Sequence, residues 1–243
     1  MRRNRESPAE TRPDIGALTE IYTRQFLELT PLRRHILSHL PLRSWECIVE
    51  PGCGTGLLAA ELSELTSASF YTGIDTDERA LALAVKRTSG TGEFRFVCAD
   101  ALEFVPAADA YVSSFFLATV GDPVAWLRKV RRVLPEGGHY AVFGEYDYGS
   151  IVEEPESGLA DALRESFGAD GFSACLGGEM NGVFEEAGFT VAASGSVQGP
   201  LQEPDHGFLG LQLGCTAAHP LDLPVNFRMS WSIVWGIYTR QAG

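Results

Sequence analysis

The stretch Cys47-Ile48-Val49-Glu50-Pro51-Gly52-Cys53-Gly54-Thr55-Gly56 decides the fold class of this 243-residue chain. A short apolar strand runs directly into three glycines spaced two apart, and a helical pattern follows over residues 57–65. Glycines at such a turn let the backbone bend sharply and let a ligand approach the main chain, because no Cβ stands in the way. The stretch therefore predicts a strand, a ligand-binding turn and a helix.

The alternation of apolar runs and helical patterns continues on both sides of this stretch. Further strands are predicted at residues 69–74, 94–98, 110–116 and 139–144, an antiparallel closing pair at 189–197 and 232–239, and helices at 76–87, 123–134, 158–167 and 178–187. Alternating short strands and helices are typical of a parallel sheet covered on both faces. We expect an α/β fold, a Rossmann-like doubly wound sheet that is mostly parallel, with an antiparallel last strand.

The length of the chain suits one domain with a full hydrophobic core. Residues 1–14 are expected to form a flexible arm, and residues 15–243 a single domain that begins with two helices within 15–44. Residues 145–188 and 199–229 are expected to cover a substrate. Glycines and prolines preclude a long helix in the second of these segments.

The composition excludes several classes of partner. The chain has 19 basic and 32 acidic side chains, and residues 145–205 hold thirteen acids and one arginine, Arg164. Such a field repels phosphate backbones, so we expect no nucleic acid and no anionic lipid as partner. Apolar stretches fall short of the roughly 20 residues that cross a bilayer, so no membrane segment is expected.

The cysteines and histidines offer no metal site. None of the five cysteines forms a Cys-x-x-Cys pair, which argues against structural zinc and against a disulfide framework and favours the cytoplasm. His35 and His39 have ligand spacing, but the glutamate of a zinc-protease motif is missing after His35. We therefore expect no metal.

Two acids follow neighbouring strands. Asp75 ends the second strand, nineteen residues after Gly56, and Asp100 follows the third. The carboxyl ends of parallel strands lie along one edge, so these acids and the glycine turn should meet in one crevice. An acid at the second strand can accept hydrogen bonds from ribose hydroxyls, which indicates a nucleotide-like ligand.

These motifs resemble those of class I S-adenosylmethionine-dependent methyltransferases. The resemblance rests on Glu50-x-Gly52-x-Gly54-x-Gly56, on Asp75 and on Cys98-Ala99-Asp100-Ala101, and it extends from about Tyr22 to Gly188 through residues 133–138 and 184–189. It implies S-adenosylmethionine as the cofactor. Its implied cofactor-binding residues are Tyr22, Glu50, Gly52, Gly54, Gly56, Asp75, Thr76, Asp100, Ala101, Leu102, Ser114 and Phe115.

The resemblance also implies what each group does. The backbone of residues 52–56 would cradle the methionine part, and Glu50 would assist its ammonium group. Asp75 would hold the ribose, and Asp100 with its two neighbours would read the adenine. Ser114 and Phe115 would line the sulfonium, and Tyr22 would close over the cofactor.

Two other functions compete with this interpretation. A dinucleotide-binding oxidoreductase is disfavoured because its Gly-x-Gly-x-x-Gly pattern has the third glycine one position later than in this chain. A protein that binds the cofactor without methylating, as a sensor or partner subunit, stays open because the sequence identifies no acceptor-side catalytic group.

Methyl transfer from a sulfonium is a direct displacement, so alignment matters more than a nucleophile. Glu145 and Tyr146 after the fifth strand, and His206 or His219 in residues 199–229, are the candidate catalytic groups. A solvated loop acid is the alternative for Glu145. Some members of the resembled family methylate amide or base nitrogens and carry an Asn-Pro-Pro-Tyr motif, which is missing after the fourth strand of this chain. The covering segments are apolar and aromatic. We therefore expect a small, largely apolar metabolite as acceptor. The sequence leaves open whether the protein forms a homodimer.

Overall fold

The computed structural model describes residues 14–66, 68–90, 92–169, 171–173, 176–206, 209, 213 and 223–241. Most of the expected N-terminal arm lies outside these residues. The strands are β1 (Cys47–Pro51), β2 (Phe70–Asp75), β3 (Phe94–Cys98), β4 (Ala110–Ser113), β5 (His139–Glu154), β6 (Phe189–Gln198) and β7 (Arg228–Arg240). The α-helices are α1 (Ile15–Glu28), α2 (Thr30–Leu37), α3 (Leu57–Leu65), α4 (Glu78–Arg87), α5 (Pro123–Val133), α6 (Leu159–Ala169) and α7 (Leu176–Glu186).

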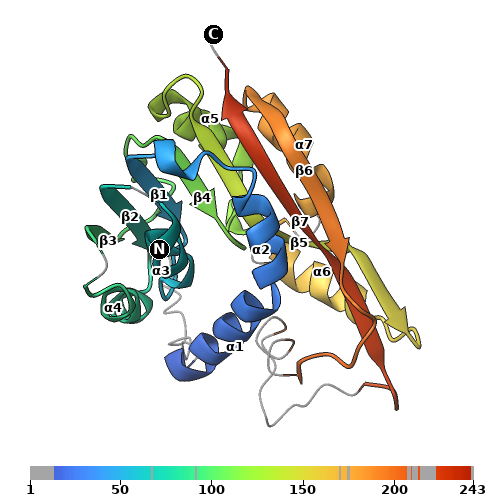
Figure 1. Ribbon diagram of the computed structural model, residues 1–243. Helices are drawn as coiled ribbons and strands as arrows, with labels where there is room; N and C mark the ends of the chain where they lie inside the picture. Colours follow the sequence, from blue (N-terminus) through green and yellow to red (C-terminus); the bar gives the residue numbers. More distant parts are fainter. Residues whose placement is uncertain are drawn as a thin grey trace, which may run out of the picture.

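The strands form one sheet in the order β3-β2-β1-β4-β5-β7-β6 (Figure 1). Neighbours from β3 to β5 pair in parallel, and β7 runs antiparallel to both β5 and β6. The order reverses between β1 and β4, which is where open α/β sheets bind their ligands. The expected fold class is confirmed, including the antiparallel closing pair.

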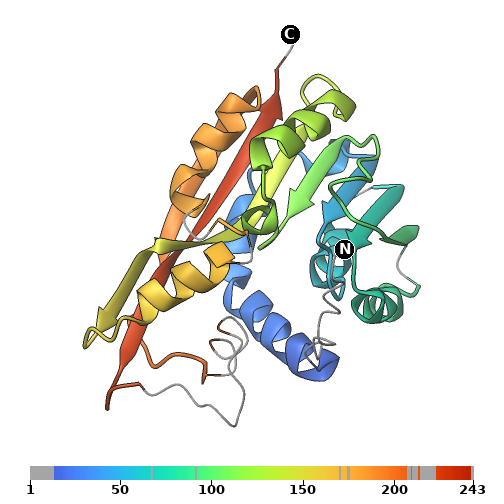
Figure 2. The same cartoon turned by 180° about the vertical axis from the view of Figure 1, so that it is seen from behind.

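Helices cover both faces of the sheet (Figures 1 and 2). Buried side chains of α5 and α7 pack on one face, and those of α2 and α3 pack on the other. The start of α5 shows how the sequence determines where a helix begins and which face it buries. Asp122 accepts a hydrogen bond from Ala125 N at 2.9 Å, and Pro123 opens the first turn. Its buried stripe, Trp126, Leu127 and Val130, then faces the sheet.

The fifth strand is much longer than the predicted 139–144. Pairing with β4 ends at Ser113 and Val142, whereas pairing with β7 continues to Glu154 and Arg228. The two strands therefore leave the sheet together as an extension, which runs to the lower right beside α6 in Figure 1. A separate buried cluster brings Tyr148 and Met229 of this extension together with Leu159 and Leu163 of α6.

Gly144 marks the point at which the strand prediction was wrong. A Cβ on this glycine would come within 3.1 Å of Ile233 and 3.3 Å of Phe115. The glycine permits close approach inside a strand and does not end it. The preceding strand is shorter than predicted, because β4 ends at Ser113 and the chain turns at Phe115.

The two expected covering segments divide in the structure. Within 145–188, α6 lies under the extension, while α7 packs against β5, β6 and β7 and is part of the fold. Within 199–229, Gln202 pairs with Met229, and Leu209 and Phe227 are buried. Most of residues 207–222, His219 included, lie outside the described part of the chain.

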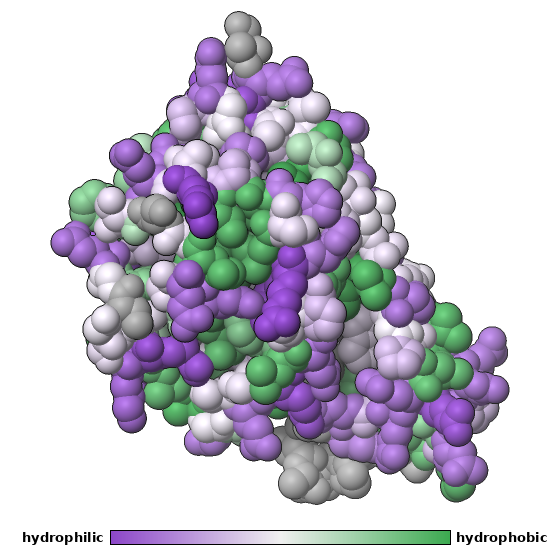
Figure 3. Space-filling model, in the orientation of Figure 1, coloured by the Kyte–Doolittle hydropathy of each residue, from purple (hydrophilic) through white to green (hydrophobic). Residues whose placement is uncertain are grey.

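The surface mixes charge and apolar groups. On the face seen in Figure 3, hydrophilic side chains surround smaller apolar areas. None of the helices in the described ranges has both the length and the apolar content of a membrane span.

Candidate functional site

A cavity of about 700 Å³ opens at the carboxyl ends of β1, β2 and β4. α1 lies across this end of the sheet (Figure 1), and its Tyr22 lines the cavity opposite the strand tips. The structure thus brings most of the sequence-predicted site residues together. Those that line the cavity are Tyr22, Glu50, Gly52, Gly54, Asp75, Thr76, Asp100, Ala101, Leu102, Ser114, Phe115, Glu145 and Tyr146.

The glycine turn is held open by its backbone conformation. Gly52 and Gly54 have φ angles of 67° and 50°, a region that L side chains rarely adopt. A Cβ on Gly52 would come within 2.7 Å of the Phe116 ring, whereas a Cβ on Gly54 would meet nothing within 4 Å. The first glycine therefore serves packing, and the second leaves the main chain exposed to a ligand.

Gly56 has a different function from the one expected. It does not line the cavity. Its φ is 73°, and a Cβ there would come within 2.9 Å of the Ala84 backbone in α4. The third glycine thus allows α3 and α4 to pack closely.

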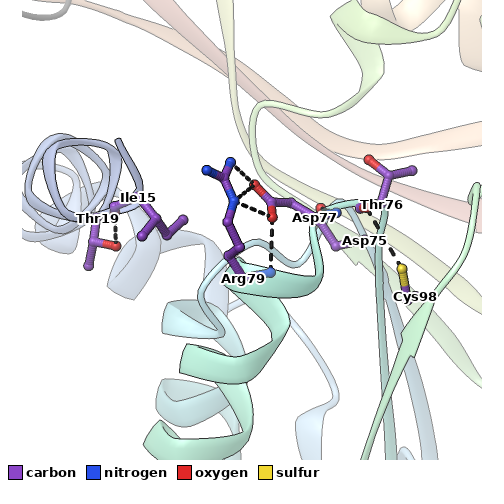
Figure 4. A network of polar contacts seen from close by, with 7 residues as sticks. All are labelled: Ile15, Thr19, Asp75, Thr76, Asp77, Arg79 and Cys98. Carbon is purple, nitrogen blue, oxygen red and sulfur yellow. Dashed lines mark hydrogen bonds and ion pairs between the residues drawn. The ribbon is translucent and has the colours of Figure 1, made fainter. Parts of the chain in front are cut away.

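Asp75 joins the glycine turn to the start of α4. Its Oδ2 accepts from Gly54 N at 2.8 Å, and its Oδ1 accepts from Asp77 N at 2.9 Å. Asp77 caps α4 through Arg79 N and pairs with the Arg79 guanidinium, as Figure 4 shows. Thr76 C=O accepts from the Cys98 thiol of β3. Two neighbouring strand tips are therefore fastened to each other at this edge of the cavity.

Asp100 forms its own turn after β3. Its Oδ1 accepts from Leu102 N at 2.8 Å. This bond folds the chain back so that residues 99–102 all line the cavity.

Glu50 is a buried carboxylate at the end of β1. It is 3% exposed and accepts a hydrogen bond from the Tyr71 hydroxyl. Burial raises its pKa to about 8, against the lowering effect of the Tyr71 bond, and the Asp75 charge raises it further. A positively charged ligand group next to Glu50 would favour the ionised form.

Thr55 and Arg33 are two of the lining residues that the sequence analysis did not identify as site residues. Thr55 lines the cavity, and its buried hydroxyl has no hydrogen-bond partner within the described ranges. Arg33 is the one basic side chain among the described lining residues, and it is 3% exposed. It donates to Glu61 at 2.7 Å. Its position four residues from both Leu29 and Leu37, on an apolar helix stripe, was the available signal.

The other end of the cavity is aromatic. The Phe115 and Tyr146 rings stack with centroids 4.4 Å apart, and Phe143, Phe167 and Phe172 also line this region. Burial, with the neighbouring Tyr148 second, raises the pKa of Tyr146 well above its usual value. The Tyr146 hydroxyl accepts from the Gln25 amide of α1, so α1 is attached to β5 across the cavity.

The catalytic candidates are placed differently from one another. Glu145 lies within β5, fully buried, so the alternative of a solvated loop acid is wrong. His206 is exposed and does not line the cavity. Its neighbour Asp205 pairs with Arg24 of α1. Tyr148, two residues further along β5 than Tyr146, is buried in the cluster that faces α6. Of the candidates within the described part of the chain, Glu145 and Tyr146 line the cavity.

Comparisons with known proteins point to one family. Residues 49–142 match the methyltransferase domain family. The chain is 31% identical over 122 residues to a malonyl-[acyl-carrier protein] O-methyltransferase of Marinomonas sp. (strain MWYL1), covering 49% of this chain and 44% of that protein. It is 28% identical over 150 residues to ribosomal RNA large subunit methyltransferase G of Vibrio cholerae, covering 56% and 39%. The chain thus spans less than half the length of these relatives.

A solved structure shows the same fold. The N-methyltransferase NodS from Bradyrhizobium japonicum WM9, in complex with S-adenosyl-L-homocysteine, superposes with a TM-score of 0.57 at 16% identity, covering 88% of this chain and 86% of that one. The match over residues 49–142 and this shared fold support a class I S-adenosylmethionine-dependent methyltransferase.

Proposed function

We propose that this protein transfers the methyl group of S-adenosylmethionine to an O, N or C atom of a small, largely apolar metabolite. One observation carries the proposal. The glycine turn, Asp75 and Asp100 face a single cavity whose far end is lined by aromatic rings.

The charges in the cavity suit this cofactor. Its described lining carries four acids, Glu50, Asp75, Asp100 and Glu145, and one basic side chain, Arg33, which is already paired with Glu61. Such a lining favours a ligand with net positive charge. S-adenosylmethionine carries an ammonium, a sulfonium and a carboxylate, whereas a dinucleotide brings phosphates that these acids would repel.

The residues present also match the parts of the cofactor. Asp75 and Asp100 supply acceptors for the ribose hydroxyls and the adenine. Glu50 would lie beside the ammonium, and Arg33 would supply a donor for the carboxylate. When bound, the cofactor supplies an activated methyl group. The protein then has to hold the acceptor in line with that group, and such alignment is worth about 7–11 kcal/mol.

The acceptor end supports a small apolar substrate. Phe115, Tyr146, Phe167 and Phe172 give it the aromatic lining of a small-molecule site. One curated relative is named for ribosomal RNA. The net charge of −13 and the single basic lining residue weigh against an RNA substrate here. We propose the cytoplasm as the compartment, because the cysteine pattern suits a reducing environment.

Two measurements test the function. Millimolar S-adenosylhomocysteine should raise the melting temperature of the protein, whereas NAD should not. Incubation with labelled S-adenosylmethionine and a metabolite extract should then label a small product. Absence of stabilisation would contradict cofactor binding. Stabilisation without label transfer would favour a non-catalytic binding protein.

A further inference from the structure

The chain after β4 is held by β5 through a row of hydrogen bonds. Phe115 N donates to Gly144 O at 2.8 Å. Phe116 N and Leu117 N both donate to Glu145 Oε1 at 2.7 Å, and Ala118 N approaches Glu145 Oε2 at 3.4 Å. Three of these four donors are therefore bound by one carboxylate, which is 0% exposed.

This segment contains a residue in an unfavourable conformation. Phe115 has a φ of 54°, a left-handed angle that is rare for a bulky side chain. Such a conformation is unfavourable and persists only where its surroundings enforce it. The bonds on either side of Phe115 supply that enforcement.

The conformation has a consequence for the cavity. It directs the Phe115 ring onto Tyr146, with an angle of 27° between the ring planes. Both rings line the aromatic end of the cavity. The next residue, Phe116, packs against Gly52 of the glycine turn, so the segment contacts both ends of the cavity.

We propose that Glu145 is a positioning residue, which holds residues 115–118 so that the Phe115 ring is fixed against Tyr146 as a wall of the acceptor site. The description of this wall as part of an acceptor site rests on the proposed function. The placement of the ring by Glu145 does not. The Glu145 carboxylate accepts hydrogen bonds from three consecutive backbone N–H groups of this segment. Removal of the carboxylate would leave these buried donors unpaired.

Substitutions of Glu145 can separate the effect of its acceptor oxygens from the effect of its charge. Glu145→Gln keeps a carbonyl oxygen at the position that accepts the two 2.7 Å bonds, so it should preserve the segment although it removes the charge. Glu145→Ala removes both acceptors, and Glu145→Asp withdraws the carboxylate by one methylene. Glu153→Ala is the matched control. Glu153 lies on the same strand and accepts backbone bonds from Ser157, Gly158 and Ala160, away from the cavity.

The test reads the position of the ring directly. 4-Fluorophenylalanine is incorporated at position 115, and its ¹⁹F resonance is recorded without cofactor. Tyr146→Ala, which removes the stacking partner, provides the reference for an unstacked ring. We expect Glu145→Gln and Glu153→Ala to leave the resonance unmoved, and Glu145→Ala and Glu145→Asp to move it towards the reference.

An unmoved resonance in Glu145→Ala or Glu145→Asp would overturn the proposal. A displacement in Glu145→Gln as large as that in Glu145→Ala would overturn it too, because charge and not the acceptor oxygen would then be responsible. If Glu145→Ala does not fold, the Asp and Gln variants still decide. A separate titration with S-adenosylhomocysteine tests the proposed function, so the two can fail independently.

Discussion

The two ends of the cavity are built in different ways. At the glycine turn, the ligand-facing groups are main chain and short acids, and hydrogen bonds between backbone and carboxylate hold them, as between Gly54 and Asp75. At the aromatic end, rings come from α1, β5 and α6 and from the chain after β4. Ring stacking and the Gln25 amide contact join these rings, and the bonds to Glu145 hold the chain after β4.

This difference separates two tasks. The glycine turn and its acids can recognise the constant parts of one cofactor, because backbone geometry changes little when side chains change. The aromatic end depends on side chains, so single substitutions can reshape it for another acceptor. We therefore expect substitutions at the glycine turn to affect cofactor affinity strongly and those at the aromatic end to affect it little.

The largest effect is expected for Asp75→Ala. It removes the proposed ribose acceptor and both backbone bonds that fix the glycine turn and the start of α4. Affinity for S-adenosylhomocysteine should fall about 100-fold, or about 2.7 kcal/mol, by isothermal titration calorimetry. Asp77→Ala is the control, because Asp77 caps α4 but does not line the cavity. Equal losses in both variants would mean that Asp75 acts only through the fold.

Glu50→Gln should lower the affinity for S-adenosylhomocysteine about 20-fold at pH 8, because a charge-assisted bond to the ammonium is lost. In the wild type this affinity should rise with pH through the Glu50 pKa of about 8, since the ammonium requires the ionised carboxylate. In the Gln variant the rise should disappear. If the affinity of Glu50→Gln still rose with pH, a group other than Glu50 would be responsible for the pH dependence.

The same carboxylate should affect stability with the opposite sign. The folded-state pKa of Glu50, about 8, exceeds its usual value, so folding favours the protonated form. The stabilisation of the folded state by protonated Glu50 is complete below about pH 4.3 and is lost as the pH rises to about 8. Glu50→Gln should therefore raise the melting temperature of the ligand-free protein at pH 8 by on the order of 3 °C, and less at pH 5. A stabilisation independent of pH would contradict this account.

Arg33→Met tests the carboxylate end of the cofactor. Affinity for S-adenosylhomocysteine should fall about tenfold, which corresponds to about 1.4 kcal/mol. Affinity for 5′-methylthioadenosine, which lacks the amino-acid part, should stay the same. Glu61→Gln, which alters the ion pair but keeps the guanidinium, is the control. Equal losses for both ligands would show that Arg33 supports α2 and not the ligand.

The smallest effect on the cofactor is expected at the aromatic end. Tyr146→Phe removes the bond from Gln25 and costs about 1 kcal/mol of stability, measured by urea unfolding. Affinity for S-adenosylhomocysteine should change by less than about twofold, or under roughly 0.4 kcal/mol. A loss comparable to that of Arg33→Met would break the distinction between the two ends.

The sequence predicted the glycine-turn end better than the aromatic end, for a physical reason. A turn that needs positive φ at Gly52 and Gly54 shows in the residues themselves. The burial of Glu145 depends on the antiparallel pairing with Val234, more than eighty residues later, and no local pattern reveals it.

Two glycines were recognised in the sequence, but the pattern did not reveal what they do in the fold. Gly56 belongs to the expected motif but serves packing against Ala84, and Gly144 suggested a strand end but permits the Phe115 ring to approach. A glycine signals that space is short, and only the fold shows whether a ligand, a helix or a ring needs that space.

A crystal structure of the protein with S-adenosylhomocysteine tests the central claim most directly. The account predicts the nucleoside between Asp75 and Asp100, with the amino-acid part along residues 52–55 and the sulfur facing Phe115. Ligand bound elsewhere at saturation, or a cavity that stays empty while the protein remains folded, would contradict it.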